Sequence, residues 1–151
     1  MPRLWIALRL LLPAVWIGLI AGLSFIETPL KFLAPGITTP LGLGIGRLVF
    51  ISLSVAGWII LVALTLIGQA RPRETGRGWL LIGAMWLIMA IESFLIRPAL
   101  AARSDVIIAG GDPGDSWLHY GYIAAELVLL AVLVWYSVHA SRSIRVEPPA
   151  A

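Results

Sequence analysis

Charged residues divide the chain into four long apolar stretches. Residues 10–26 and 48–70 contain no charged side chain, whereas residues 78–96 are interrupted once by Glu92 and residues 116–141 once by Glu126. A helix needs about 20 mostly apolar residues to cross the hydrocarbon core of a bilayer. The pattern therefore predicts an all-α protein, a four-transmembrane-helix bundle formed by a single membrane domain. We expect the spans at approximately residues 5–27, 46–69, 78–97 and 116–139, followed by a cytoplasmic tail at 140–151.

Composition supports a membrane protein and excludes several other classes. Of the 151 residues, 60% are hydrophobic and only 13% are charged, which is too much apolar surface for one soluble core. Cysteine does not occur, so disulfides, thiol chemistry and cysteine-held metal clusters are excluded. The net charge of +3 is too small and too scattered to indicate nucleic-acid binding. We expect the lipid bilayer as the main partner.

Basic residues beside the spans predict the orientation, because loops rich in lysine and arginine stay in the cytoplasm. The side of the two termini carries seven: Arg3, Arg9, Arg71, Arg73, Arg77, Arg142 and Arg145. The other side carries four: Lys31, Arg47, Arg97 and Arg103. Both termini should therefore be cytoplasmic. The near-exclusive use of arginine, with much alanine, glycine and proline, is typical of a GC-rich bacterium, so we expect the bacterial inner membrane.

The outer connections contain strong turn signals. Pro29 is expected to end the first helix, and the prolines and glycines of residues 35–46 should keep the next segment irregular. In GGDPGDS, Gly114 can accept a positive φ, and Asp115 or Ser116 can cap the fourth helix.

Two short segments resemble each other. IETPLKFLAP begins at Ile26 and IESFLIRPAL begins at Ile91; in both, Ile-Glu is followed four or five residues later by a basic residue. The pattern favours two helical hairpins related by duplication, although a chance match is the alternative.

Small residues form a ridge on the first helix. Ala14, Gly18 and Gly22 recur at four-residue spacing, which permits close helix contact in lipid. Packing within the bundle and a homodimer seam are the two interpretations.

The spans also predict a polar cluster near the outer membrane face. Its candidate members are Glu27, Lys31, Arg47, Glu92, Arg97, His119, Tyr122 and Glu126. His119, Tyr122 and Glu126 share one helical face, and Glu126 is the deepest. A charge near the bilayer centre costs at least ~2.5–3.5 kcal/mol, so Glu126 should face the bundle, pair with a base or remain protonated.

Two interpretations of this cluster remain open. In the first it is a structural lock, with three glutamates balanced by Lys31, Arg47 and Arg97. In the second it lines a cavity open to the outside, where Glu126 senses a proton or cation with His119 as its partner. Arg47 and Arg97 would then hold an anionic ligand or a lipid headgroup.

Metal and cofactor sites are disfavoured. A metal site built from Glu27, Glu92, His119 and Glu126 has suitable ligand types, but three nearby cations oppose it. His119 and His139 are about 30 Å apart along one helix, so they cannot hold one haem, and His139 is interpreted as a cytoplasmic-end residue. We expect no cofactor, and no catalytic motif supports an enzyme.

The segments IETPLKFLAPGIT, LGLGIGRLVF and RPALAARSDVIIAG…SWLHYGYIAAEL resemble a family of small, uncharacterised bacterial four-helix integral membrane proteins. More distantly, the proline- and arginine-containing third loop, followed by Leu118 and His119, resembles a membrane family of unknown function with animal relatives. The resemblance covers most of the chain and implies the fold without an activity.

Two functions are therefore expected from the residues. The first is the handling of a small ligand, lipid or ion through the outer cluster, as in a transporter. The alternative is a structural or accessory subunit that associates with itself or with another membrane protein.

Overall fold

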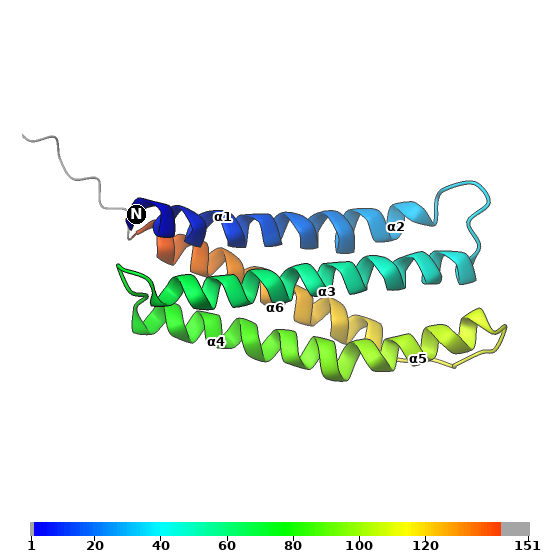
Figure 1. The fold of residues 1–151 in the computed structure, drawn as a ribbon. Coiled ribbons are helices and arrows are strands. Elements are labelled where there is room, and N and C mark those ends of the chain that lie inside the picture. Colours follow the sequence, from blue (N-terminus) through cyan, green and yellow to red (C-terminus); the bar gives the residue numbers. More distant parts are fainter. Residues whose placement is uncertain (1, 143–151) are drawn as a thin grey trace, which may run out of the picture.

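The computed structural model describes residues 2–142, all of whose regular structure is helical. The elements, in chain order, are α1 (Pro2–Ile20), η1 (Ala21–Glu27), α2 (Thr28–Lys31), α3 (Thr39–Gln69), α4 (Gly76–Ile91), η2 (Glu92–Ile96), α5 (Arg97–Ile108) and α6 (Leu118–Ser141). The segments η1 and η2 are π-helical and continue into the α-helices beside them. The chain therefore forms four long helical rods (Figure 1).

Each rod is long and apolar enough to cross a membrane, as expected for a multi-pass membrane protein. The candidate spans are Leu4–Lys31, Thr39–Gln69, Gly76–Ile108 and Leu118–Ser141. The predicted four-helix bundle is thus confirmed. Three of the four rods extend well beyond the approximate spans predicted from the sequence, chiefly at the end where residues 32–38 and 109–117 connect them.

Consecutive rods run antiparallel and close into a ring. α1 packs against α3 and α6, and α4 packs against the same two helices from the other side. Two ends follow from this arrangement (Figure 1). The terminal end contains the start of α1, the connection 70–75 and the end of α6. The two-loop end contains the connections 32–38 and 109–117.

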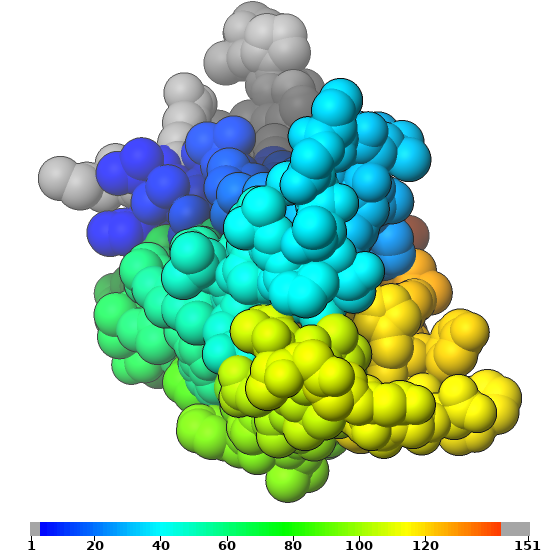
Figure 2. Space-filling model, turned by 90° about the vertical axis from the view of Figure 1, so that its right-hand side faces the viewer, coloured from blue at the N-terminus to red at the C-terminus, as the bar shows by residue number. Residues whose placement is uncertain are grey.

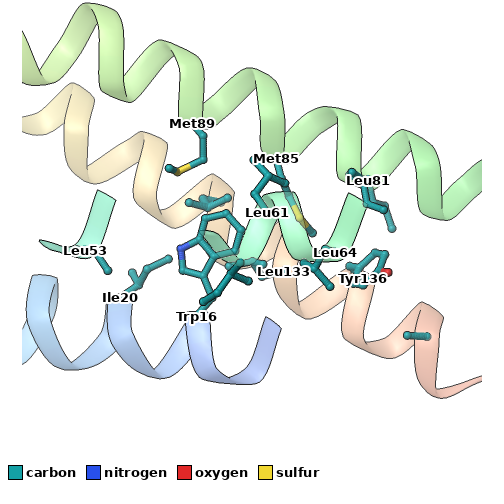
Figure 3. Close-up of a cluster of buried hydrophobic side chains, with 14 residues drawn as sticks. Trp16, Ile20, Leu53, Leu61, Leu64, Leu81, Met85, Met89, Leu133 and Tyr136 are labelled. Carbon is teal, nitrogen blue, oxygen red and sulfur yellow. The ribbon is translucent and has the colours of Figure 1, made fainter. Parts of the chain in front are cut away.

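All four rods contribute to one apolar core (Figure 3). Its fully buried side chains include Trp16, Leu61, Leu64, Met85 and Leu133. The Trp16 indole fits against α3 because residue 57 is glycine: a Cβ there would lie 3.0 Å from the ring. In lipid, close packing of this kind supplies much of the attraction between helices.

The small-residue ridge of α1 does not pack inside the bundle. Ala14 and Gly18 are exposed, and a Cβ added at Gly18 or Gly22 would meet nothing within 4 Å. The intramolecular interpretation of this ridge is therefore wrong, because the face of α1 that packs is the one that carries Trp16 and Ile20.

Pro29 does not end the first rod, contrary to the prediction. Proline lacks an N–H and its ring presses on the preceding turn of an α-helix. Here the preceding turns are the π-helical η1, whose wider hydrogen-bond pattern precedes the proline in the first turn of α2. Pro98 takes the same place after η2 in the third rod.

The first outer connection is also shorter than predicted. α3 begins at Thr39, with Pro40 in its first turn and the Thr38 hydroxyl accepting a hydrogen bond of 3.4 Å from Leu41 N. The prediction of an irregular segment as far as residue 46 is therefore wrong. Gly42 serves packing instead, because a Cβ there would overlap the Phe32 ring.

The predicted GGDPGDS turn is confirmed. Gly114 has φ +69°. The N-cap residue of α6 is Trp117, and not Asp115 or Ser116 as predicted, although Ser116 Oγ accepts a hydrogen bond of 3.1 Å from Leu118 N. The Arg103 side chain of α5 donates to the carbonyls of Pro113 and Gly114. These bonds hold the connection as it runs back along α5 to the start of α6 (Figure 1).

Candidate functional site

Four of the predicted cluster residues meet between the third and fourth rods. Arg97 Nη2 lies 3.5 Å from Glu92 Oε2 and 3.8 Å from Glu126 Oε1. The Tyr122 hydroxyl donates a hydrogen bond to Glu126 Oε1 from one turn earlier on α6. We call Glu92, Arg97, Tyr122 and Glu126 the Glu92–Glu126 cluster.

The helix geometry explains the pairing of Glu92 with Arg97. The two residues are five apart, which would place them on different faces of an α-helix. At the π-helical segment η2 the Arg97 N–H bonds to the Glu92 carbonyl five residues earlier, the i→i+5 pattern of a π-helix. This wider turn brings the two side chains close together, and Arg97 also reaches Glu126 of α6. The equivalent pair in the first rod, Glu27 and Lys31, is four residues apart and lies 3.3 Å apart. Both Ile-Glu segments therefore form local ion pairs, while their duplication stays a prediction.

Arg97 is fixed by α3 as well. Its Nη1 donates a hydrogen bond of 2.8 Å to the carbonyl of Phe50, and its guanidinium lies 5.7 Å from the centre of the Tyr122 ring. The Phe50 ring packs edge-on against Tyr122 at 5.3 Å. Arg97 thus connects α3, α5 and α6 and leaves only 16% of its side chain exposed.

The cluster contains more acid than base. The Glu92 and Glu126 side chains are 0% and 2% exposed, and one guanidinium faces both. Glu92 Oε1 and Glu126 Oε2 are buried without a hydrogen-bond partner among the described residues. Buried carboxylate oxygens normally have donors, so these two oxygens can still accept a proton or contact a small cation.

The other predicted members lie elsewhere. Lys31 pairs with Glu27, and Arg47 pairs with Asp105 and donates a hydrogen bond of 3.1 Å to the carbonyl of Ala101. The predicted balance of three acids and three bases is therefore wrong. Arg97 is engaged by Glu92, Glu126 and the Phe50 carbonyl, whereas Arg47 makes both of its contacts through Nη2 and its side chain is 35% exposed.

His119 is not a partner of Glu126. It is exposed and its ring packs near Tyr120, which is itself 65% exposed. A shared helical face predicted proximity, but the first turn of α6 is at the edge of the bundle, with Trp117 84% exposed. Within residues 2–142, no three His, Asp or Glu side chains are grouped so as to hold a metal ion.

A second buried cluster lies at the terminal end and was not predicted. Arg9 of α1 donates hydrogen bonds to the carbonyls of Ile67, Ala70 and Pro72, at 2.9, 3.3 and 2.7 Å. Its Nη1 lies 3.7 Å from Glu74 Oε2. Arg9 therefore fixes the connection between α3 and α4 onto α1.

Glu74 is surrounded by donors. Its Oε2 accepts a hydrogen bond of 3.0 Å from the Tyr136 hydroxyl, and its Oε1 accepts one of 3.0 Å from Thr75 N. His139 Nε2 lies 3.5 Å from the same carboxylate and hydrogen-bonds Thr75 Oγ1 at 2.8 Å. We call Arg9, Glu74, Tyr136 and His139 the Glu74 cluster.

The sequence contained two signals for the Glu74 cluster. Arg9 stands only four residues before Pro13, within the first helix and not in a loop, and Glu74 is the only acid among the arginines of its connection. Arg9 enters the sequence prediction only through the orientation of the spans, and Glu74 is given no role there. A charge one or two turns inside a span is itself evidence for a buried partner.

Comparisons with protein-family models, curated proteins and solved structures find no match to this chain. The resemblance to small bacterial four-helix membrane proteins therefore stays a prediction, and the function is argued from the site alone.

Proposed function

We propose that the chain is a multi-pass protein of a bacterial inner membrane that binds a small cation, a proton or Na⁺, at the Glu92–Glu126 cluster. The observation that carries this proposal is the pair of buried carboxyl groups that share one guanidinium and each keep an oxygen without a donor among residues 2–142.

Charge favours a cation over an anion or a lipid headgroup. Two ionised carboxylates and one arginine would leave a net charge of −1 in a site that is shielded from water. Leaving a charge uncompensated in such a place is costly, so the group takes up a proton or a counter-ion instead. The guanidinium that an anion would need is already engaged by Glu92, Glu126 and the Phe50 carbonyl.

The orientation rests on the basic residues. Seven lie on the side of the membrane that holds the two termini and the connection between the second and third spans, and four lie on the other side. We therefore place both termini in the cytoplasm. The Glu92–Glu126 cluster then lies in the outer half of the bilayer. Protons or Na⁺ would reach it from outside, past the partly exposed Arg97.

Infrared spectroscopy of the protein in vesicles tests this proposal. A protonated carboxylic acid gives a carbonyl band that ionised carboxylates do not give. We expect such a band at neutral pH, and we expect it to weaken when Na⁺ replaces choline or when the external pH is raised. Glu126→Gln and Glu92→Gln should each remove the response, whereas Glu27→Gln, at a partly exposed ion pair, should retain it.

The outcomes separate the two expected functions. A band that responds to pH and not to Na⁺ identifies the cation as the proton. If no band responds to either, or if the response survives both variants, the cluster is structural. The chain would then be better described as a structural or accessory subunit.

A further inference from the structure

The arginines of the terminal end differ from the basic residues of the two-loop end. Four arginines are exposed at the terminal end: Arg71, Arg73, Arg77 and Arg142. Within residues 2–142, none of the four forms an ion pair with a carboxylate. The carboxylate nearest to them along the chain, Glu74, is buried and already held by Arg9 and Tyr136. This end therefore presents positive charge that the described part of the chain does not neutralise.

At the two-loop end the basic groups are occupied. Lys31 pairs with Glu27, Arg47 with Asp105, and Arg97 with the buried glutamates. The Arg103 guanidinium donates to two loop carbonyls. Free positive charge is thus concentrated at one end of the spans.

An open hollow lies beside these arginines, between the end of α3 and the start of α4. It has a volume of about 400 Å³ and is lined by Gly68, Gln69, Arg73, Glu74 and Trp79. Arg73 and Gln69 offer N–H donors, and Trp79 is an exposed indole, at 37%, of the kind found at membrane interfaces. Glu74 does not repel an anion strongly here, because its charge is offset by Arg9 and its oxygens accept from neighbouring donors.

A second, apolar hollow continues along the same side of α3. It has a volume of about 380 Å³ and is lined by Trp58, Ile59, Val62, Ala63 and Leu66. These positions recur at helical spacing and share a face with Gln69. From Gln69 to Trp58 the helix rises about 16 Å at 1.5 Å per residue, which is about half of the ~30 Å hydrocarbon thickness. The two hollows thus follow one leaflet from its surface to its middle.

We propose that this side of α3 binds one anionic phospholipid. The headgroup phosphate would lie against Arg73 and Gln69 beside Trp79, and an acyl chain would lie along Leu66, Val62 and Ile59. A lipid fits better than a soluble anion because the apolar hollow follows the polar one along the same face of α3, where Ile59 and Leu66 are exposed. This inference does not depend on cation binding at the Glu92–Glu126 cluster, which lies toward the other end.

Native mass spectrometry tests the proposal with the full chain in micelles that contain equal amounts of phosphatidylglycerol and phosphatidylcholine. We expect one phosphatidylglycerol molecule to be retained in preference to phosphatidylcholine. Arg73→Gln should lower the preference about five-fold, the equivalent of the ~1 kcal/mol that one basic residue contributes at an anionic surface. Val62→Trp should fill the apolar hollow and lower retention of both lipids without any change in charge.

Arg142→Gln is the matched control, because it removes an exposed arginine of the same end that does not line the hollow. Its effect should be clearly smaller than that of Arg73→Gln. An equal loss in both variants would indicate diffuse attraction and overturn the proposal. Displacement of the lipid by inorganic phosphate, or a lipid preference that survives both Arg73→Gln and Val62→Trp, would also overturn it. Circular dichroism of each variant establishes that the helices are intact.

Discussion

The Glu74 cluster and the Glu92–Glu126 cluster are built from the same side-chain types and differ in balance. In each, a buried glutamate accepts a hydrogen bond from a tyrosine hydroxyl of α6 and faces an arginine of another rod. The Glu74 cluster has one carboxylate, and both of its oxygens have donors. The Glu92–Glu126 cluster has two carboxylates, and each retains an oxygen to which no group in the described part of the chain donates.

This difference shows that a buried acid inside a membrane bundle does not by itself indicate function. A carboxylate whose donors are complete has little to gain from a ligand, and it is suited to fixing the helices around it. A carboxylate pair with surplus charge and free acceptors is incomplete, so a proton or cation can complete it. The number of donors per carboxylate oxygen is therefore the feature by which we distinguish the structural Glu74 cluster from the proposed binding site at the Glu92–Glu126 cluster.

The largest effect is expected when the cation of the Glu74 cluster is removed. Arg9→Met leaves Glu74 without its base and takes the donor from three backbone carbonyls. Breaking a buried ion pair by removing one partner costs about 3–5 kcal/mol, and we expect a loss of that size. Unfolding by SDS titration in mixed micelles, followed by tryptophan fluorescence, measures it. The exposed Arg77→Met is the control and should change stability by less than about 0.5 kcal/mol; similar losses in both would show that Arg9 is no lock.

A smaller effect separates the two kinds of glutamate. Glu74→Gln removes the counter-charge of Arg9 but leaves Arg9 its three carbonyl acceptors and puts an amide of similar size in place of the carboxylate. We therefore expect a smaller loss than for Arg9→Met, about 1.5–3 kcal/mol, the range for hydrogen bonds to charged groups. Glu92→Gln removes a surplus charge and resembles the protonated form of the site. Its stability in the same assay should therefore stay within about 1 kcal/mol of the parent. If Glu92→Gln is the more destabilising of the two, the Glu92–Glu126 cluster is the true lock.

The membrane fold could be predicted from the sequence because the bilayer leaves few alternatives. Backbone groups in lipid must be satisfied within the segment, so four apolar stretches of sufficient length already define four helices. Glu92, Arg97, Tyr122 and Glu126 could be grouped for a similar reason. They lie at comparable depth on rods three and four, where an ionisable side chain must turn inward.

The contacts that the sequence did not predict are those that depth in the membrane does not determine. Arg47 lies at the two-loop end, as predicted, but it pairs with Asp105 and not with a glutamate of the cluster. Asp105 is within reach because the third rod extends to Ile108. The Glu74 cluster joins residues more than 60 positions apart, so it depends on how α1 and α6 meet the connection 70–75. The π-helical segments gave no pattern of apolar residues that distinguishes them from α-helix.

The smallest predicted effect compares the two tyrosines. Tyr136→Phe removes one of the donors to the Glu74 carboxylate, which should cost about 1 kcal/mol. Tyr122→Phe removes the hydroxyl donor from Glu126, a carboxyl group that can take up a proton instead. Its cost should therefore be largest in alkaline solution, where Glu126 is ionised and needs a donor, and should shrink as the pH falls. Thermal unfolding of both variants across a pH series measures the two costs. If the cost of Tyr122→Phe did not change with pH, Glu126 would not take up a proton in place of its lost donor, and the contrast between the clusters would then be one of position only.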